Sequence, residues 1–463
     1  MFLSQFFLQS SKRLIICVSI CVFCFPIYLS CSESSVRQSS RDTPAVKDNI
    51  NGNGATKANR VEDERARALI AMGYFDRAKT DNPKTQSVTQ SGAKAFDGYY
   101  LFGSRHRAEA YLMDGDGTVV HKWKADEKRP PWMYSILLKN GDILTIAKGR
   151  YLARYNWNSE LIWKKKMGAH HDVTVGPDDN IYVLEHRINQ YKYKGVQIPI
   201  MDDNIVVLSQ DGKKLRRRKL FPLVRELVPE KRFRRIRKLV QDGADTAKLI
   251  REGAPSDTTH TNSIQVIPKD IPGVAPAGSI LLSVREINRI VILDNRMDNL
   301  LWSWGEGELE GQHHATLIDN GNITIFDNGV RREQSRVTEM NPTSGDIVWT
   351  YASDDFYSRL RGSVQKLPNG NYLVTESDTG HVFEITKTKE QVWEFWNPDV
   401  IRSKPPTRGV IYRMMAYPAD YLEDGLLKHT SRLTRHASGQ TVLRNRKRLH
   451  VARRRLSPEI CKA

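Results

Sequence analysis

Six short apolar runs recur along the chain, and a polar turn opens each of them. The runs, from DGYYLFG to GNYLVTE, are rich in β-branched and aromatic residues, as strands are. The first residues of successive turns lie 43, 39, 99, 42 and 49 positions apart. Self-similarity at roughly 40 to 50 residues is typical of four-stranded propeller blades. The pattern therefore predicts an all-β fold, a six-bladed β-propeller over residues 96–415. The turns begin at Asp97, Asn140, Asp179, Gly278, Asn320 and Asn369.

A tryptophan follows five of the six runs, and the third unit ends at VVLSQDGKKL without one. Each blade of a propeller buries its faces against its neighbours, and closing the ring leaves few exposed strand edges. We therefore expect one domain rather than several. The stretch GVIYRMMAY, after the last repeat, is expected to supply one more strand that helps to close the ring. The tryptophans are Trp123, Trp163, Trp302, Trp349 and Trp393.

The interval of 99 residues indicates an insertion. Its segment Lys213–Pro255 is rich in basic residues and helical in pattern. We predict an inserted helical segment over residues 213–255. Its basic side chains either face solvent, the favoured reading, or meet an anionic partner.

The amino-terminal segment, residues 1–31, has the pattern of an export signal. Lys12 and Arg13 precede the apolar run Leu14–Leu29, and a polar stretch follows. Three readings stay open: a cleaved signal peptide, lipidation at Cys31, and an uncleaved N-terminal membrane anchor. All three place the rest of the chain outside the cytoplasm, in the periplasm or on a membrane facing away from the cytoplasm.

Residues 32–95 are predicted to be a linker that contains one short helix, Val61–Lys79, with apolar residues at helical spacing. The five cysteines lie in or beside the export segment and in the tail, so the repeat region has none. Disulfides, thiolate catalysis and cysteine-ligated zinc are therefore excluded for the propeller.

The net charge of +18 is concentrated at the carboxyl end. From Gly425 onward there are eleven basic residues and one acidic residue, a net +10. Because this stretch lacks apolar periodicity, residues 416–463 are predicted to be a solvated basic tail. The remainder of the chain is only mildly basic, so no nucleic-acid partner is predicted.

Histidines occupy related positions in different repeats. Ten residues before the apolar residue that opens the strand after a turn, the third unit has His171 and the fifth has His313, whereas the sixth has Gly362. His260 precedes the strand of the fourth unit in HTNSIQVIP. Equivalent positions in a propeller surround one axis, so we expect the imidazoles of His171 and His313 to converge. The offset does not transfer cleanly to His260, because the loop before Gly278 is longer. The alternative is that such a histidine ties strands together by hydrogen bonds. In the doubled pairs at 170–171 and 313–314, one ring can pack while the other faces the channel, because adjacent strand residues point to opposite faces.

Arg336 adds a cation after the Asn328-Gly329 turn. A guanidinium beside imidazoles suits a tetrahedral or trigonal anion, because its planar fork matches two oxygens. The alternative is an ion pair between this arginine and a carboxylate on the rim. Zinc is the weaker interpretation of the histidines, since no carboxylate partner can be placed beside them. No metal and no cofactor are therefore predicted.

Several motifs, in order along residues 96–415, resemble those of bacterial exported arylsulfotransferases of the propeller type. They are GAHHDVTVGPDDNIYVL, HTNSIQVIP, GQHHATLIDNGNITIFDNG and RGSVQKLPNGNYLVTESDTGHVFEIT. The resemblance implies a six-bladed propeller that transfers a sulfuryl group from a phenolic sulfate ester to another phenol. It also implies a sulfated histidine intermediate and independence from the nucleotide sulfate donor.

Carried over by motif, the resemblance implies active-site positions at His260, His313 and Arg336, and the repeat pattern adds His171. The family's nucleophilic histidine belongs to a later blade, yet residues 351–380 contain no histidine. A second hypothesis is therefore a non-catalytic propeller that binds a sulfated or phenolic ligand or a protein partner. A metal-dependent hydrolase is a third.

Overall fold

The computed structural model describes residues 77–80, 87–105, 107–125, 130–250, 254–402 and 404–427. The predicted export segment, most of the predicted linker and helix, and the basic tail from Lys428 onward lie outside the described residues. Among the described residues, no helix is both long enough and apolar enough to cross a membrane.

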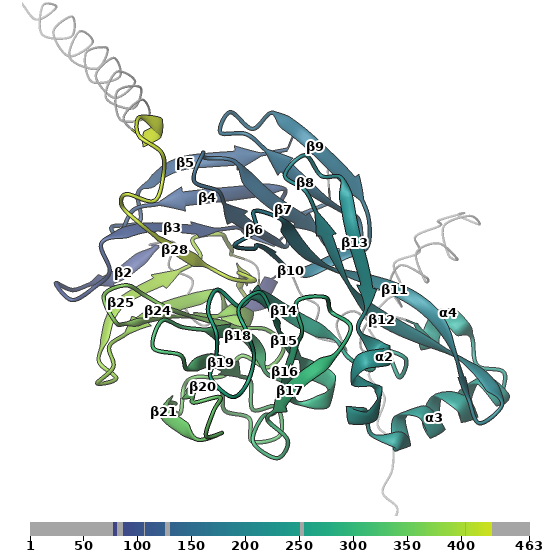
Figure 1. Ribbon diagram of the computed structural model, residues 1–463. Coiled ribbons are helices and arrows are strands. Elements are labelled where there is room, and N and C mark those ends of the chain that lie inside the picture. Colours follow the sequence, from purple (N-terminus) through teal and green to yellow (C-terminus); the bar gives the residue numbers. More distant parts are fainter. Residues whose placement is uncertain are drawn as a thin grey trace, which may run out of the picture. The chain divides into compact units, whose positions relative to one another are not determined.

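Five antiparallel sheets of four strands and one of five strands form the six blades, which confirms the predicted six-bladed β-propeller (Figure 1). From the innermost strand outward, blade 1 consists of β28 (Met415–Pro418), β3 (Gly98–Phe102), β4 (Glu109–Met113) and β5 (Val119–Lys124); blade 2 of β6 (Tyr134–Leu137), β7 (Ile143–Ala147), β8 (Tyr151–Tyr155) and β9 (Leu161–Lys166); and blade 3 of β10 (Ala169–Val175), β11 (Ile181–Tyr193), β12 (Val196–Leu208) and β13 (Lys214–Lys219). Blade 4 consists of β14 (Thr261–Val266), β15 (Ile280–Val284), β16 (Arg289–Leu293) and β17 (Leu300–Trp304); blade 5 of β18 (His313–Leu317), β19 (Ile323–Asp327), β20 (Arg336–Met340) and β21 (Ile347–Tyr351); and blade 6 of β22 (Ser363–Lys366), β23 (Tyr372–Glu376), β24 (His381–Ile385) and β25 (Gln391–Trp396).

The Asn-Gly turns are held by their own side chains. The side-chain oxygen of Asn320 accepts a hydrogen bond from the amide of Asn322 (2.9 Å), and Asn369 does the same for Asn371 (3.1 Å). This local bond favours a turn over continued strand, and the following glycine supplies the positive φ, 89° at Gly321. The repeat seen in the sequence is therefore a repeat of one turn geometry.

Tryptophans at the outer strands bond to the next blade. Trp163 Nε1 donates to Gln210 O (2.9 Å), from blade 2 to blade 3. The same bond recurs between later blades, with Trp304 as the donor in blade 4 rather than the Trp302 of the sequence pattern. The other three pairs are Trp304 Nε1 to Gly345 O (2.9 Å), Trp349 Nε1 to Lys387 O (2.9 Å) and Trp393 Nε1 to Gly115 O (2.8 Å).

Both ends of the described chain close the ring. β28, which lies in the stretch expected to supply one more strand, pairs with β3 and completes blade 1. At the other end β2 (Val88–Ser91), predicted as linker, pairs with β25 as a fifth strand of blade 6. The Gln365 side chain then joins blade 6 to β28, since its amide donates to Ala416 O (2.9 Å) and accepts from Ala416 N (2.8 Å). The propeller thus extends beyond both predicted boundaries, 96 and 415.

The insertion is helical only in part. Lys214–Lys219, predicted as the start of the helical segment, is the outer strand β13. Its basic side chains suit an exposed outer strand as well as a helix face, and this is why the pattern misled. The helices follow it: α2 (Phe221–Val224), the 3-10 helix η1 (Arg225–Leu227), α3 (Glu230–Gln241) and α4 (Thr246–Leu249).

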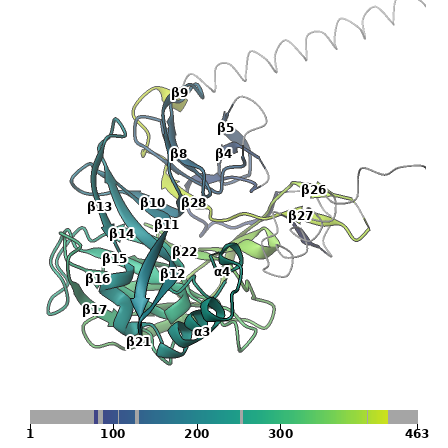
Figure 2. The same ribbon diagram turned by 90° about the vertical axis from the view of Figure 1, so that its right-hand side faces the viewer.

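These helices pack on the β11–β12 hairpin, which is longer than the other hairpins of the blades (Figure 2). Phe233 and Ile236 of α3 are buried against residues of the hairpin such as Tyr193 and Ile198. The hairpin therefore lengthens blade 3 to support the insertion.

Three shorter elements complete the described fold. β1 (Arg77–Lys79) forms a small sheet with β27 (Thr407–Gly409) and β26 (Val400–Ile401), so the end of the predicted helix Val61–Lys79 is strand. The 3-10 helices η2 (Arg285–Ile287) and η3 (Ser377–Thr379) follow the second strands of blades 4 and 6.

Candidate functional site

The inner strands of blades 3, 4 and 5 are irregular where the predicted histidines lie. The pairing register shifts within β10, β14 and β18. His171, His260 and His314 have φ values of 53°, 47° and 49°. Left-handed backbone is uncommon for residues other than glycine, and such strained positions cluster at functional sites. These bulges turn side chains out of the regular alternation of a strand.

One residue in each bulge ties its blade to the next. Its side chain accepts a hydrogen bond from a backbone amide of the neighbouring inner strand. His314 is one of these ties, so the alternative reading of the histidines holds for the second ring of that pair. The bonds are Ile264 N to Asp172 Oδ2 (3.0 Å), Ala315 N to Ser263 Oγ (3.1 Å) and Val364 N to His314 Nδ1 (3.3 Å).

His171 and His260 lie side by side. Their ring centroids lie 4.8 Å apart, and both side chains are buried. His260 Nδ1 lies 2.5 Å from Asp257 Oδ2, a buried carboxylate that the sequence analysis did not find. A carboxylate bonded to one ring nitrogen orients the imidazole and stabilises its protonated form. Burial lowers the pKa of His171 well below its usual value, and the charge of Lys148 lowers it further.

The hydrogen bonds of His313 fix its tautomer. Its Nδ1 faces two acceptors, Asn328 Oδ1 at 2.8 Å and Gly311 O at 3.1 Å. The Asn328 amide cannot flip without loss, because its Nδ2 donates to Ser358 O (2.6 Å) and Arg361 O (2.8 Å). The Nδ1 atom of His313 therefore carries the proton, and Nε2 keeps its lone pair.

The environment of His313 also keeps the ring neutral. Burial lowers its pKa well below the usual value, and the nearby charge of Arg285 lowers it further. His260 and Arg413 contribute in the same direction. A neutral, buried imidazole with a fixed lone pair is a nucleophile.

Arg336 is not brought to the histidines. It lies on β20, two strands out from β18, where its Nε binds Asp327 Oδ2 (2.9 Å) and its Nη2 donates to Glu308 O (2.6 Å). None of its polar contacts among the described residues is a histidine. The expected imidazole–guanidinium site therefore does not form with this residue, and Arg336 makes the rim ion pair that was the alternative.

Two other arginines, Arg285 and Arg413, lower the pKa of His313 through their charge. Arg413 is buried, with Nη1 3.0 Å from Asp172 Oδ1 and its guanidinium 4.5 Å from the Tyr134 ring centroid. Arg285 forms an ion pair with Glu286. In both arginines the buried Nε has no hydrogen-bond partner among the described residues. These two N–H groups are donors available to an anion.

A cavity of about 270 Å³ is lined by residues that contact His260 and His313, although neither histidine lines it. The amide of Arg285 donates to His260 O (3.3 Å), and Gly311, another lining residue, is bonded to His313. The cavity is close to the lower limit of usual ligand-site volumes. Its lining combines cationic and acidic groups and consists of Arg232, Arg285, Glu286, Asn288, Glu310, Gly311, Val330 and Arg331.

Gly362 occupies the position in blade 6 that corresponds to His313. This correspondence is one of sequence offset, since both residues lie ten positions before the residue that opens the next strand. In the strand pairing, the bulge in β18 places His313 opposite Phe326, whereas in blade 6 Ser363 lies opposite Thr375. A Cβ atom at Gly362 would lie 2.2 Å from the buried Phe326 ring. Blade 6 thus has no room for a histidine at this position.

Sequence reasoning missed Asp257, Arg285 and Arg413 for different reasons. Asp257 lies three residues before His260, a spacing that an i, i+3 search for carboxylates beside histidines would have found. Arg413 lies beyond the last repeat and Arg285 in a 3-10 helix, and no repeat position marks either of them.

The fold and these residues define a propeller with buried imidazoles and guanidinium groups at its inner strands. The arylsulfotransferase (ASST) family model matches residues 135–398, and the chain belongs to this family. No curated protein matches the chain.

The solved structures that are similar to this chain share little of its sequence. A Bacteroides caccae protein of unknown function is 13% identical over 69% of this chain and 99% of its own, with a TM-score of 0.46. A streptogramin B lyase is 12% identical, covers 74% of this chain and 97% of its own, and has a TM-score of 0.42. The Dos1 propeller is 7% identical, covers 67% of this chain and 76% of its own, and has a TM-score of 0.36.

Proposed function

We propose that the protein transfers a sulfuryl group from a phenolic sulfate ester to a second phenol through a sulfated His313. Family membership supports the aryl sulfate and phenol as substrates. The observation that carries the choice of His313 is the Asn328 hydrogen bond, which leaves a lone pair on Nε2. No nucleotide donor and no cofactor enter this reaction.

In the first step His313 Nε2 attacks the sulfur, forming an N–S bond. The S–O bond to the aryl group breaks, and the phenolate leaves with that electron pair. Arg285 and Arg413 stabilise the charge on the sulfuryl oxygens through their unpartnered Nε–H groups. Splitting one difficult transfer into two easier displacements is the benefit of the covalent intermediate.

In the second step the acceptor phenol attacks the same sulfur and the N–S bond breaks, which restores His313. His260 Nε2 takes the proton of the acceptor phenol as this oxygen bonds to sulfur. Asp257 stabilises the imidazolium that forms, since it is 2.5 Å from Nδ1. The proton then returns to the released phenolate.

The site of action is proposed to lie outside the cytoplasm. Lys12 and Arg13 before the apolar run Leu14–Leu29 support an exported protein, either released into a periplasm or held by an N-terminal anchor.

A chromogenic aryl sulfate with an added phenol tests the proposed transfer. We expect acceptor-dependent release of the chromophore by the wild-type protein and loss of it in His313→Ala. His121→Gln is the matched control, because His121 lies in blade 1 and bonds to Trp157 O. In the absence of acceptor, peptide mass spectrometry should find one added SO₃ group on the His313 peptide. Full turnover by His313→Ala would refute the assignment.

A non-catalytic propeller that binds a sulfated or phenolic ligand is the second candidate. Gly362 favours it, because this position of the later blade holds no histidine and a Cβ atom there would meet the Phe326 ring. Saturable binding of an aryl sulfate, measured by calorimetry, without chromophore release would favour this candidate over the transferase.

A further inference from the structure

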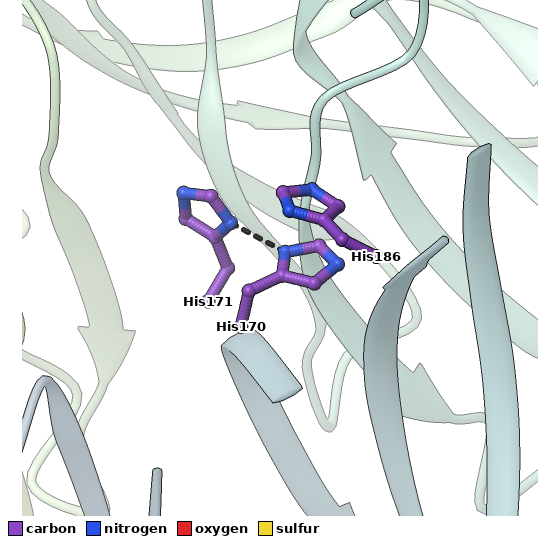
Figure 3. Close-up of side chains that lie close together, drawn as sticks. All are labelled: His170, His171 and His186. Carbon is purple, nitrogen blue, oxygen red and sulfur yellow. Dashed lines mark hydrogen bonds between the residues drawn. The ribbon is translucent and has the colours of Figure 1, made fainter. Parts of the chain in front are cut away.

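A second group of histidines lies in blade 3, next to the proposed reaction site. It contains His170 and His171 of β10, His186 of β11 and Asp203 of β12 (Figure 3 shows the three histidines). The His170 and His186 rings stack, with centroids 3.4 Å apart. One nitrogen from each histidine can be chosen so that all three lie within 4.8 Å of one another.

Both stacked rings turn one nitrogen toward the same carboxylate oxygen. His186 Nε2 lies 3.0 Å and His170 Nε2 lies 3.3 Å from Asp203 Oδ1. In a tetrahedral zinc site with bonds of ~2.0–2.2 Å, neighbouring ligand atoms lie about 3.3 Å apart. Although His186 Nε2 and Asp203 Oδ1 lie 3.0 Å apart, their alignment is not that of a hydrogen bond. Among the described residues, neither atom has a hydrogen-bond partner.

The other oxygen of Asp203 is held in place. Its Oδ2 accepts from Thr259 Oγ1 (2.7 Å) and from Thr261 N (2.7 Å). Metal-binding carboxylates are commonly fixed in this way by hydrogen bonds outside the ligand set. The arrangement leaves Oδ1 directed at the imidazoles.

Burial makes the charged form of Asp203 unfavourable unless a positive group lies beside it. Asp203 is fully buried and lies beside Asp202, which is also fully buried. Among the described residues, no lysine or arginine forms an ion pair with Asp203. A buried carboxylate without a cation is costly, and a bound cation would remove that cost.

We propose that His170, His171, His186 and Asp203 bind a divalent transition-metal ion of the zinc type. Three imidazoles and one carboxylate are ligands that zinc accepts in a tetrahedral site, and four protein ligands make a closed, structural site. The His171 ring must turn to join it, because His171 Nδ1 now lies 2.6 Å from His170 Nδ1. The ion would fasten β10 to the β11–β12 hairpin that carries the inserted helices.

Zinc was the weaker interpretation in the sequence analysis because no carboxylate could be placed beside the histidines. Asp203 now lies beside His170 and His186. In the sequence, the whole of β11 and the following turn separate Asp203 from His171. Asp203 lies near the histidines only because the β11–β12 register pairs it with His186. The ion is independent of the sulfuryl transfer, since its ligands do not include His260 or His313.

The experiment is metal analysis of the full chain, purified without a metal-affinity tag. We expect one zinc per chain after incubation with Zn²⁺ and dialysis, and a lower melting temperature after chelation. His186→Ala and Asp203→Asn should both lose the ion, whereas His121→Gln should retain it. Metal content is measured without turnover, so failure of the transferase proposal would not affect this result.

Reconstitution of the wild-type chain with Co²⁺ decides the matter if the variants fold poorly. A ligand-field spectrum of tetrahedral cobalt, displaced by Zn²⁺, is expected. Substoichiometric zinc in the wild type, or zinc content unchanged in a folded His186→Ala variant, would overturn the proposal.

Discussion

Replacing Asn328 by alanine tests the tautomer on which the proposed chemistry of His313 depends. The change removes the 2.8 Å bond to Nδ1 and leaves only the longer contact with Gly311 O, 3.1 Å. A buried hydrogen bond contributes about 1 kcal/mol net, so the tautomer protonated on Nδ1 loses roughly five- to tenfold of its preference. In the other tautomer, Nε2 carries the proton and cannot attack sulfur.

The expected result is a fall in kcat of about five- to tenfold with KM nearly unchanged, because the ring remains in place and only its reactive form is depleted. The assay is steady-state transfer from a chromogenic aryl sulfate, supported by single-turnover sulfation of the enzyme. Asn322→Ala is the control, since Asn322 bonds to Glu339 in the turn of the same blade.

Folding must be checked in the same variant. Asn328 Nδ2 also bonds to Ser358 O and Arg361 O, and the loss of each buried hydrogen bond costs about 1 kcal/mol. Thermal melts therefore set the temperature of the assay. An unchanged kcat in folded Asn328→Ala, or a rise in KM alone, would refute the tautomer argument.

Two further predictions concern blade 6. Gly362→Ala should lower the free energy of unfolding by roughly 2–4 kcal/mol, measured by denaturant titration, because the new Cβ meets the Phe326 ring. His381 should stabilise the fold at acidic pH. Burial lowers its pKa, but hydrogen bonds and charges from Glu376 and Glu394 outweigh burial and raise it. Its stabilisation is complete below the unfolded value, about 6.5, and is lost as pH rises through the folded pKa. His381→Gln should therefore destabilise the protein at pH 5.5 by more than at pH 8.5, as measured by thermal melts.

Each of these has a matched comparison. Gly321→Ala adds a side chain at another positive φ, 89°, with nothing within 4 Å, so it should cost only backbone strain, about 1 kcal/mol. Equal losses in the two glycine variants would contradict the clash with Phe326. For His381, a destabilisation that does not vary with pH would contradict the role of its charge.

The blade count could be predicted because it rests on local chemistry. An Asn side chain that bonds its own turn, followed by a glycine with positive φ, leaves the same mark wherever it occurs, as at Asn320 and Asn369. The tryptophans were equally visible, although which of Trp302 and Trp304 bonds to the next blade depends on side-chain direction.

The partners in the site could not be predicted because they come from other blades or from irregular backbone. Arg336 looked suitable by its motif, yet Asp327, its neighbour across the β19–β20 pair, holds it away from the histidines. Arg413 reaches Asp172 from the segment just before the closing strand β28, 241 residues further along the chain. The run Lys214–Lys219 reads equally well as helix or outer strand, and only its pairing with β12 decides.

The closing strand β28 has a consequence for how the chain matures. Blade 1 receives its axial strand from residues 415–418, long after its other three strands have been synthesised. Pairings between such distant segments form late, because the loop between them must first be brought together. A polypeptide cut short of Met415 would leave the hub open on one side, and water would reach Arg413's neighbours from there. The pairing of β28 with β3 thus closes the propeller ring and buries Arg413 and Asp172 in the same folding step.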